Sequence, residues 1–374
     1  MKRTEFETIK EVRNHLQGSS DLSHAVFQSI NLSEITEDLR AARLQHNVLL
    51  GCSANPETLA LFESPVILPS LNGASFKPFR SSLYTPEELL GGYTIGDPDA
   101  HSKTLDGRCY SEYVTQGKAQ ADDVVVTLLR RLHDHGITDA LQEFIQGRNV
   151  VAIMGGHSMP RSLGTYLNVA RLARDLRNAG FLTISGGGPG AMEATHVGAW
   201  FAERDDSELQ EAVQMLSMAP GYDPINQWMD AAFKVIEKFP LTSETACESL
   251  GIPTWLYGHE PPTPFATKIA KYFANSVREE GLLAIANCGV VFTPGSEGTI
   301  QEVFQDAAQN RYKTFEHASP MVFFGEDFWK YRKPVYPLLA QLSAASDYGK
   351  LISITDESAS VLHTMSEFAK TLGT

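Results

Sequence analysis

Cysteine is scarce in this 374-residue chain, and its spacing excludes two common uses of that residue. Cys52, Cys109, Cys247 and Cys288 are far apart and form neither a CxxC nor a CxxH pair. A structural zinc site or a disulfide framework normally shows recognisable spacing, so we expect four reduced thiols. The histidines contain no HExxH motif either. We therefore expect no metal site.

Basic residues are also few, with 31 Lys and Arg against 45 Asp and Glu and a formal net charge of −14. Binding to nucleic acid or to an anionic membrane requires a basic surface, so we expect neither partner. No apolar run approaches the roughly 20 residues that a membrane helix needs. The first residues lack the apolar core of a secretory signal, which favours a cytoplasmic location.

The first 148 residues show weak periodicity, and we interpret them as an N-terminal α/β extension or accessory domain. Residues 73–120 are rich in Gly, Ser, Pro and Tyr, which is typical either of a functional loop or of structure that the pattern does not reveal. We find no internal repeats. The expected elements are helices at 36–45, 122–135 and 138–146, the last two interrupted at Gly136, and strands at 46–50 and 64–71.

Residues 149–374 show a clear β-α-β-α alternation. Short apolar strands that alternate with amphipathic helices predict an α/β fold, a Rossmann-like parallel sheet with helices on both faces. Residues 203–245 are interpreted as a helical insertion that is broken at 220–224. The expected strands are 150–154, 181–184, 253–257 and 288–293, and the expected helices are 166–179, 191–202 and 265–280.

Two glycine-rich turns follow two of these strands. One is Ser185-Gly186-Gly187-Gly188-Pro189-Gly190, and the other is Thr293-Pro294-Gly295-Ser296-Glu297-Gly298. A turn of this kind directs several backbone N–H groups and the positive end of a helix dipole toward one point. One glycine-rich turn would be weak support, but two at strand-to-helix junctions predict a site for a phosphorylated small molecule.

The segments GGGPGAMEA at 186–194 and PGSEGTIQE at 294–302 resemble the motifs GGGxxGxM and PGGxGTxxE of the Lonely Guy family. This superfamily of phosphoribohydrolases is often labelled "lysine decarboxylase", a label without support here because we find no lysine motif for pyridoxal phosphate. The similarity covers roughly residues 149–374, and the long chain looks more like the bacterial nucleotide 5′-monophosphate nucleosidases. The resemblance implies a homo-oligomeric hydrolase that needs no cofactor and cleaves a nucleoside 5′-monophosphate to free base and ribose 5-phosphate.

The resemblance also implies the roles of individual residues. Glu302 corresponds to the catalytic glutamate, and Arg278 is the arginine of the preceding helix, one residue further from the loop than is usual. Ser296 stands where the motif has its second glycine. The residues expected to bind substrate are Gly186, Gly187, Gly188, Gly190, Glu193, Gly295, Ser296, Gly298, Thr299, Gly156 and His157.

Each charged residue also has a structural interpretation. Glu302 ends the segment Thr299–Glu302, which fits a capping box and would leave the carboxylate on the helix backbone. Glu193 fits either a first-turn carboxylate that complements the helix dipole or a ribose ligand. Arg278 fits a solvated helix end, although a shared helical face with Lys271 and Asn275 would line the site.

Two other functions remain open from the sequence. A non-catalytic nucleotide sensor would keep both glycine loops without needing Glu302 or Arg278 in reactive geometry. A phosphotransferase is disfavoured because the chain has no GxxxxGK[ST] segment. His259-Glu260, at the end of an expected strand, is a further candidate for ligand contact.

Overall fold

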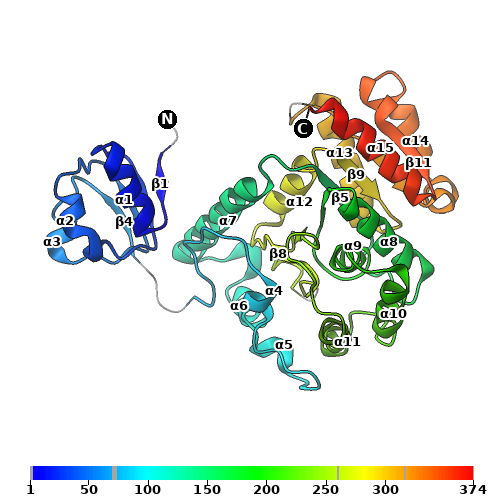
Figure 1. Ribbon diagram of the computed structural model, residues 1–374, viewed down its shortest axis with the longest axis horizontal. Coiled ribbons are helices and arrows are strands. Elements are labelled where there is room, and N and C mark those ends of the chain that lie inside the picture. The colour runs from blue at the N-terminus through cyan, green and yellow to red at the C-terminus, as the bar shows by residue number, and fades with distance from the viewer. Residues whose placement is uncertain (1–2, 70–73, 259–260, 316, 374) are drawn as a thin grey trace. The chain divides into compact units, whose positions relative to one another are not determined.

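The computed structural model describes residues 3–69, 74–258, 261–315 and 317–373 (Figure 1). The chain divides into two compact units. The smaller comprises Met1–Ser82 and Ala121–Ala140, and the larger comprises Leu83–Gln120 and Leu141–Thr374. This division differs from the expected boundary at residue 148, because residues 83–120 belong to the larger unit.

The smaller unit contains a four-stranded parallel sheet in the order β1-β2-β3-β4. Each turn of the chain adds one strand in register, so Val26 pairs with Val48 and Val48 pairs with Val66. Apolar side chains such as Phe27 and Leu49 form its core. Its elements are β1 (Glu5–Phe6), α1 (Ile9–Gly18), β2 (Val26–Gln28), α2 (Thr36–Leu39), β3 (Val48–Leu50), α3 (Pro56–Leu59) and β4 (Val66–Leu68).

This register shows a structural repeat, which corrects the expectation that the chain has none. The residues before β2, β3 and β4 at matching positions, His24, His46 and Ser64, all take a positive φ of 63°, 54° and 52°. The rings of His24 and His46 stack with centroids 5.4 Å apart. The repeat consists of a recurring backbone conformation and strand register. Few side chains recur, so the sequence alone did not reveal it.

One continuous helix, α7 (Val124–Ile145), replaces the two expected at 122–135 and 138–146, so the expected interruption at Gly136 is wrong. A Cβ at Gly136 would lie 2.0 Å from the backbone oxygen of Arg80. The glycine therefore permits close contact between helix and chain within the smaller unit, and this explains its presence in the middle of a helix.

The larger unit contains a seven-stranded sheet in the order β11-β10-β9-β5-β6-β7-β8. All of its strand pairs are parallel, which confirms the expected α/β fold. The chain starts at the central β5, proceeds to β8 on one side and then continues through β9 to β11 on the other. The strands are β5 (Val150–Met154), β6 (Leu182–Ser185), β7 (Ser249–Gly251), β8 (Lys268–Ile269), β9 (Gly289–Phe292), β10 (Met321–Phe324) and β11 (Ile352–Thr355).

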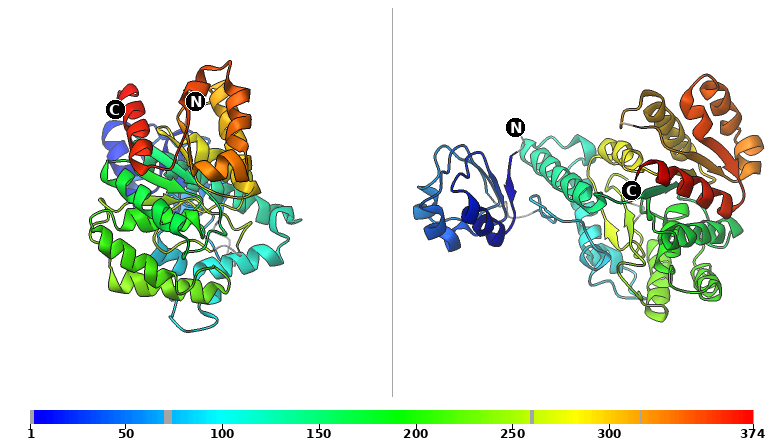
Figure 2. Two further views of the ribbon diagram at one scale, coloured as in Figure 1. Left: turned by 90° about the vertical axis from the view of Figure 1, so that its right-hand side faces the viewer. Right: turned by 45° about the horizontal axis from the view of Figure 1, so that its top comes forward.

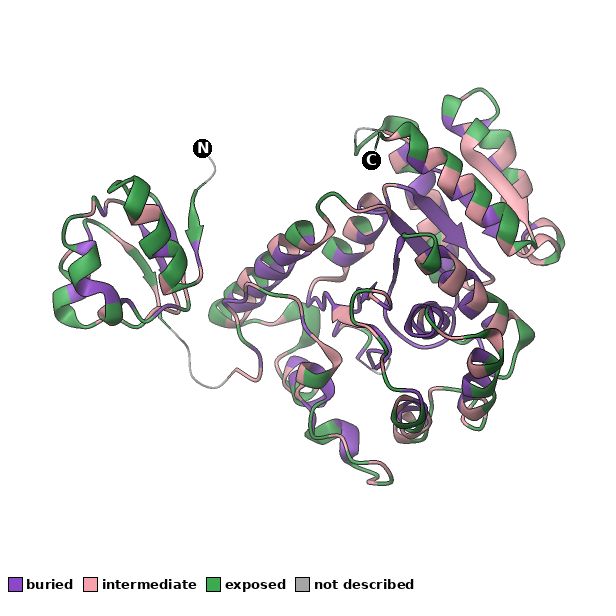
Figure 3. Cartoon of the chain, in the orientation of Figure 1, coloured by how far each residue is buried: buried purple, intermediate pink, exposed green. Residues whose placement is uncertain are grey.

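Helices cover both faces of this sheet (Figure 2). Right-handed crossovers that run in opposite directions from β5 place the helices on opposite faces. The central strands are wholly buried, whereas the edge strand β11 is only half-buried (Figure 3). The helices are α8 (Gly164–Asn178), α9 (Ala191–Trp200), α10 (Asp206–Leu216), α11 (Ile225–Lys238), α12 (Asn275–Ala284), α13 (Glu297–Tyr312), α14 (Val335–Ser343) and α15 (Ser358–Thr371).

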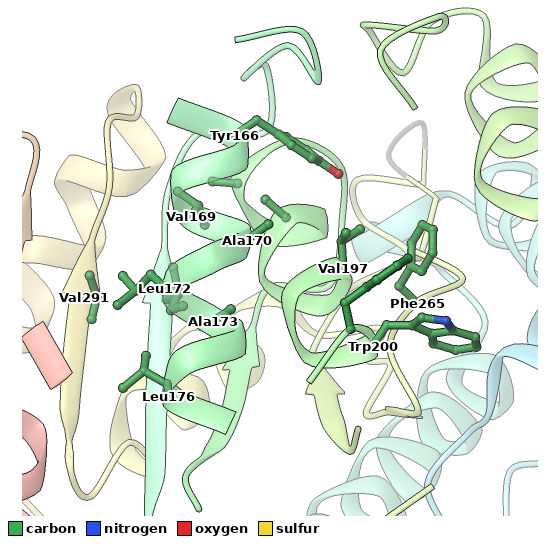
Figure 4. Close-up of a cluster of buried hydrophobic side chains, with 14 of the residues drawn as sticks. Tyr166, Val169, Ala170, Leu172, Ala173, Leu176, Val197, Trp200, Phe265 and Val291 are labelled. Carbon is green, nitrogen blue, oxygen red and sulfur yellow. The ribbon is translucent and has the colours of Figure 1, made fainter. Parts of the chain in front are cut away.

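The main core lies where α8 and α9 pack on the sheet. Leu172 and Leu176 of α8 belong to one apolar cluster with Val291 of β9 and Val197 of α9 (Figure 4). The periodicity of α8 predicts this buried face, since its apolar residues recur three and four positions apart. The core fixes β5, β6 and β9, the three strands whose carboxyl ends carry the loops described below.

Two expectations about residues 253–280 are wrong. Residues 253–257 form no strand, since β7 ends at Gly251 and Trp255 is buried outside the sheet. The expected helix from 265 begins only at Asn275, because Ile269 exchanges backbone hydrogen bonds with Tyr84 and is extended. Aromatic and apolar residues are compatible with either state, and contacts distant in sequence decide between them.

The segment 73–120, which the pattern did not resolve, contains short helices joined by loops in its described part. It contains α4 (Pro86–Leu90), α5 (Ala100–Lys103) and α6 (Leu105–Thr115). Asp106 of α6 is fully buried in an ion pair with Lys271 and accepts a hydrogen bond of 3.0 Å from the indole of Trp255. This buried pair anchors the segment to the larger unit, and it takes Lys271 away from the helical face predicted for it.

Candidate functional site

Three loops converge at the carboxyl ends of β5, β6 and β9. The amide of Gly156, after β5, donates to the oxygen of Pro294, after β9, at 3.2 Å. The amide of Ala191, after β6, donates to the oxygen of Gly156 at 3.1 Å. Because β5 lies between β6 and β9, the loops meet at the point where the strand order reverses, which is where open α/β sheets bind ligands.

Gly190 shows how closely these loops approach one another. Its φ is +70°, and a Cβ at this position would lie 2.3 Å from the backbone oxygen of Gly156. Both the left-handed conformation and the close approach require glycine. The sequence therefore fixes the contact between the loops after β5 and β6.

A cavity of about 310 Å³ opens between these loops, a volume within the range of small-molecule sites. Most of the residues predicted from sequence line it, together with several that the sequence did not single out. The predicted lining residues are Gly156, His157, Gly186, Gly188, Arg278, Ser296, Gly298, Thr299 and Glu302. The additional ones are Gly155, Met192, Pro253, Thr254, Tyr257, Glu279, Glu297 and Gln301.

Four predicted substrate-binding residues lie outside this lining. Gly187 and Gly190 shape the first loop from behind, and the side of Gly295 that would carry a Cβ faces Thr299, 2.2 Å from its Oγ1. Glu193 is buried in the core. His259 and Glu260 fall outside the described residues.

Arg278 and Glu302 lie side by side in the cavity wall. The Nη1 of Arg278 is 3.9 Å from the Oε1 of Glu302, and the two side chains are 10% and 15% exposed. The pair is a loose contact, longer than a hydrogen bond. Arg278 also contacts Asn275, to which its Nη2 donates at 2.9 Å, and its Nε has no hydrogen-bond partner among the described residues. The Nη1 of Arg278 makes no hydrogen bond to the described residues, so this nitrogen can donate to a ligand in the cavity.

Burial raises the pKa of Glu302 to about 7, because removal from water disfavours the charged carboxylate. Arg278 opposes this rise and the neighbouring Glu279 adds to it. A carboxyl group with this pKa exchanges its proton readily near neutral pH, the property that general acid–base chemistry requires.

The capping alternative for Glu302 is excluded by the position of the helix start. Helix α13 begins at Glu297 and its N-cap residue is Ser296, so Glu302 lies in the second turn. Ser296 makes no side-chain capping bond. Glu302 therefore does not cap α13, and its side chain lines the cavity.

Glu193 lies in the first turn of α9, as one of its two interpretations expects, and its buried carboxylate also takes part in a hydrogen-bond network. Its two oxygens accept from Nε and Nη2 of Arg161 at 2.8 and 2.5 Å, and one also accepts from the hydroxyl of Tyr166 at 2.9 Å. Nη1 of Arg161 donates to the oxygens of Ala219 and Trp228 in the 203–245 insertion. This buried network joins α9 to the insertion. No sequence signal pointed to Arg161, which follows the unremarkable segment Ser158-Met159-Pro160.

Within the described part of the chain, no cluster of three or more His, Cys, Asp or Glu side chains has the arrangement of a metal site. No helix there has both the length and the apolar character to span a membrane.

Neither protein-family models nor curated proteins match the chain. Solved structures do. The molybdenum cofactor binding protein from the phototrophic bacterium Rippkaea orientalis aligns at 15% identity and a TM-score of 0.38, over 61% of this chain and 99% of its own. The Moco carrier protein from Chlamydomonas reinhardtii aligns at 13% identity and a TM-score of 0.38, over 60% and 99%. Proteins this dissimilar need not share a ligand.

Proposed function

We propose that the chain hydrolyses the N-glycosidic bond of a nucleoside 5′-monophosphate and releases the free base and ribose 5-phosphate. The observation that carries the proposal is the loose pair of Glu302 and Arg278 in a cavity that is also lined by the strand-end glycine loops. The two motifs that resemble the Lonely Guy phosphoribohydrolases support the same reaction.

The 5′-phosphate would be bound mainly by backbone donors. The cavity lining contains one arginine but three glutamates, Glu279, Glu297 and Glu302, so its side chains do not form a cationic site. Amides at the start of α13 and in the loop after β6 supply N–H groups and a favourable helix dipole. Binding energy at the phosphate then positions the ribose against Glu302.

Glu302 and Arg278 would act at the ribose. As the bond between C1′ and the base nitrogen breaks, its electron pair goes to the base and C1′ becomes oxocarbenium-like. The Glu302 carboxylate stabilises this positive charge and accepts a proton from the water whose oxygen bonds to C1′. That proton then passes to the departing base. Arg278 orients the carboxylate and the ribose hydroxyls.

The test is to incubate the purified protein with nucleoside 5′-monophosphates and with the corresponding nucleosides, and to assay free base and ribose 5-phosphate. We expect the monophosphates to be cleaved at least about tenfold faster, since the phosphate contributes binding energy. Comparable turnover of adenosine and adenosine 5′-monophosphate would contradict the phosphate site. Tight binding of monophosphates without release of base would favour the sensor.

A further inference from the structure

A buried chain of hydrogen bonds runs from β7 to the glycine loop after β6. Ser249 Oγ lies 2.9 Å from Nδ1 of His196, and Nε2 of His196 lies 2.8 Å from Oγ of Ser185. Ser185 Oγ then accepts from the amide of Gly187 at 3.1 Å. Ser185, His196 and Ser249 are all fully buried, so none of them meets a ligand directly.

The two ring nitrogens of His196 both have a hydrogen-bond partner. The hydroxyl of Ser185 also lies 3.2 Å from the oxygen of Met192, to which it can donate. In the tautomer with the proton on Nε2, His196 donates to Ser185 and accepts from the hydroxyl of Ser249. Burial lowers the pKa of His196 to about 3, so the ring stays neutral throughout the working pH range.

This chain of bonds determines how the glycine loop presents its backbone. Gly187 lies between Gly186 and Gly188, both of which line the cavity. Its amide is held from behind by Ser185, and its oxygen accepts from the amide of Thr263 at 2.9 Å. With the middle residue held on both sides, the flanking residues have a fixed orientation before any ligand arrives. Such pre-organisation reduces the entropy lost on binding.

We propose that His196 is a positioning residue for the phosphate site, which holds the loop 186–188 in its binding conformation through Ser185. The inference rests on the proposed function, in which this loop binds the 5′-phosphate. His196 acts through the loop backbone and takes no part in bond cleavage, so its loss should weaken binding and leave the chemical step nearly unchanged.

Two substitutions separate positioning from simple core packing. In His196→Gln the side-chain amide nitrogen can replace Nε2 and still donate to Ser185, whereas in His196→Asn it can replace only Nδ1 and faces Ser249. Both remove the ring from the same buried place and should lower Tm by similar amounts. We expect His196→Asn to raise KM for a nucleoside 5′-monophosphate by about tenfold relative to His196→Gln, with kcat changed less than about threefold.

The same comparison is made by calorimetry with ribose 5-phosphate, so that it does not depend on catalysis. Equal Kd values for the two variants would overturn the inference, as would a wild-type protein that does not bind ribose 5-phosphate. If wild-type protein binds ribose 5-phosphate but releases no base, the proposed function fails and the two Kd values still decide the role of His196. Should His196→Asn not fold, Ser185→Ala replaces it and Ser249→Ala replaces His196→Gln, with the same expected order of Kd.

Discussion

The two helices that follow the glycine loops each carry a glutamate paired with an arginine, but the two pairs differ in nearly every physical respect. Glu193 on α9 is fully buried, and both of its oxygens accept hydrogen bonds from Arg161. Glu302 on α13 borders a cavity, and its nearest contact with Arg278 is 3.9 Å. The first pair is closed, and the second leaves donor and acceptor capacity for a ligand.

The difference shows that desolvation and pairing act separately on a carboxylate. Both carboxylates are largely removed from water, but Glu193 is compensated by a fork of charged donors and Glu302 is not. Without that compensation, burial raises the pKa of Glu302 toward neutrality. A buried charge without full pairing lowers the stability of the fold, and a strongly shifted pKa is typical of functional sites. We therefore propose that the pair of Arg278 and Glu302 is the catalytic one.

Glu193→Gln tests the closed pair, and we expect a strong loss of stability. The substitution removes the charge that compensates buried Arg161 and should lower the free energy of unfolding by about 3 kcal/mol. Denaturant unfolding measures the change. The double variant Arg161→Met/Glu193→Met is the control, because it removes both charges and should recover much of the loss. A loss below about 1 kcal/mol in Glu193→Gln would show that the two pairs differ less than their geometry indicates.

The matching substitution at the second pair is Glu302→Gln. It should lower activity strongly and should not lower stability. Turnover of the monophosphate should fall about 10²-fold, because the amide can neither accept a proton nor stabilise the positive ribose. Stability at pH 8 should stay the same or rise, since the buried carboxylate no longer has to ionise. Steady-state kinetics and thermal unfolding of the same samples give both quantities. Full activity in this variant would end the hydrolase assignment and favour the sensor.

A third buried carboxylate, Asp306, lies one turn beyond Glu302 on α13 and is 2% exposed. Its Oδ2 has no hydrogen-bond partner among the described residues, and burial raises its pKa to about 8. Between about pH 4 and pH 8 the folded state therefore keeps a proton that the unfolded chain has lost, so stability falls as pH rises.

Asp306→Asn removes this proton uptake and should stabilise the protein at pH 7 by at least about 1 kcal/mol, with little change at pH 4. Denaturant unfolding at both pH values measures the difference. The contribution of Glu302, whose pKa is raised in the same direction, remains in both proteins and serves as an internal reference. An equal stability change at both pH values would contradict the assigned pKa of Asp306.

Much of the larger unit could be predicted because its signals are local. The spacing of Val169, Leu172 and Leu176 predicts the buried face of α8, and the position of Gly190 between strand and helix predicts the loop. Residues 253–280 resisted prediction because their conformation depends on partners far along the chain. Trp255 and Lys271 both bind Asp106, which is 149 and 165 residues away from them in the sequence, and no periodicity indicates such a contact.

The alternation of strands and helices, the two glycine loops at strand ends and the motifs that resemble those of the phosphoribohydrolases can all be read from the residue order. These features follow from periodicity and backbone freedom, which neighbouring residues settle among themselves. Folding determines which glutamate is held by an arginine, Glu193 by Arg161, and which one lines the cavity, Glu302. That choice depends on the loss of water and on charges brought from distant elements, and neither quantity exists until the chain has folded.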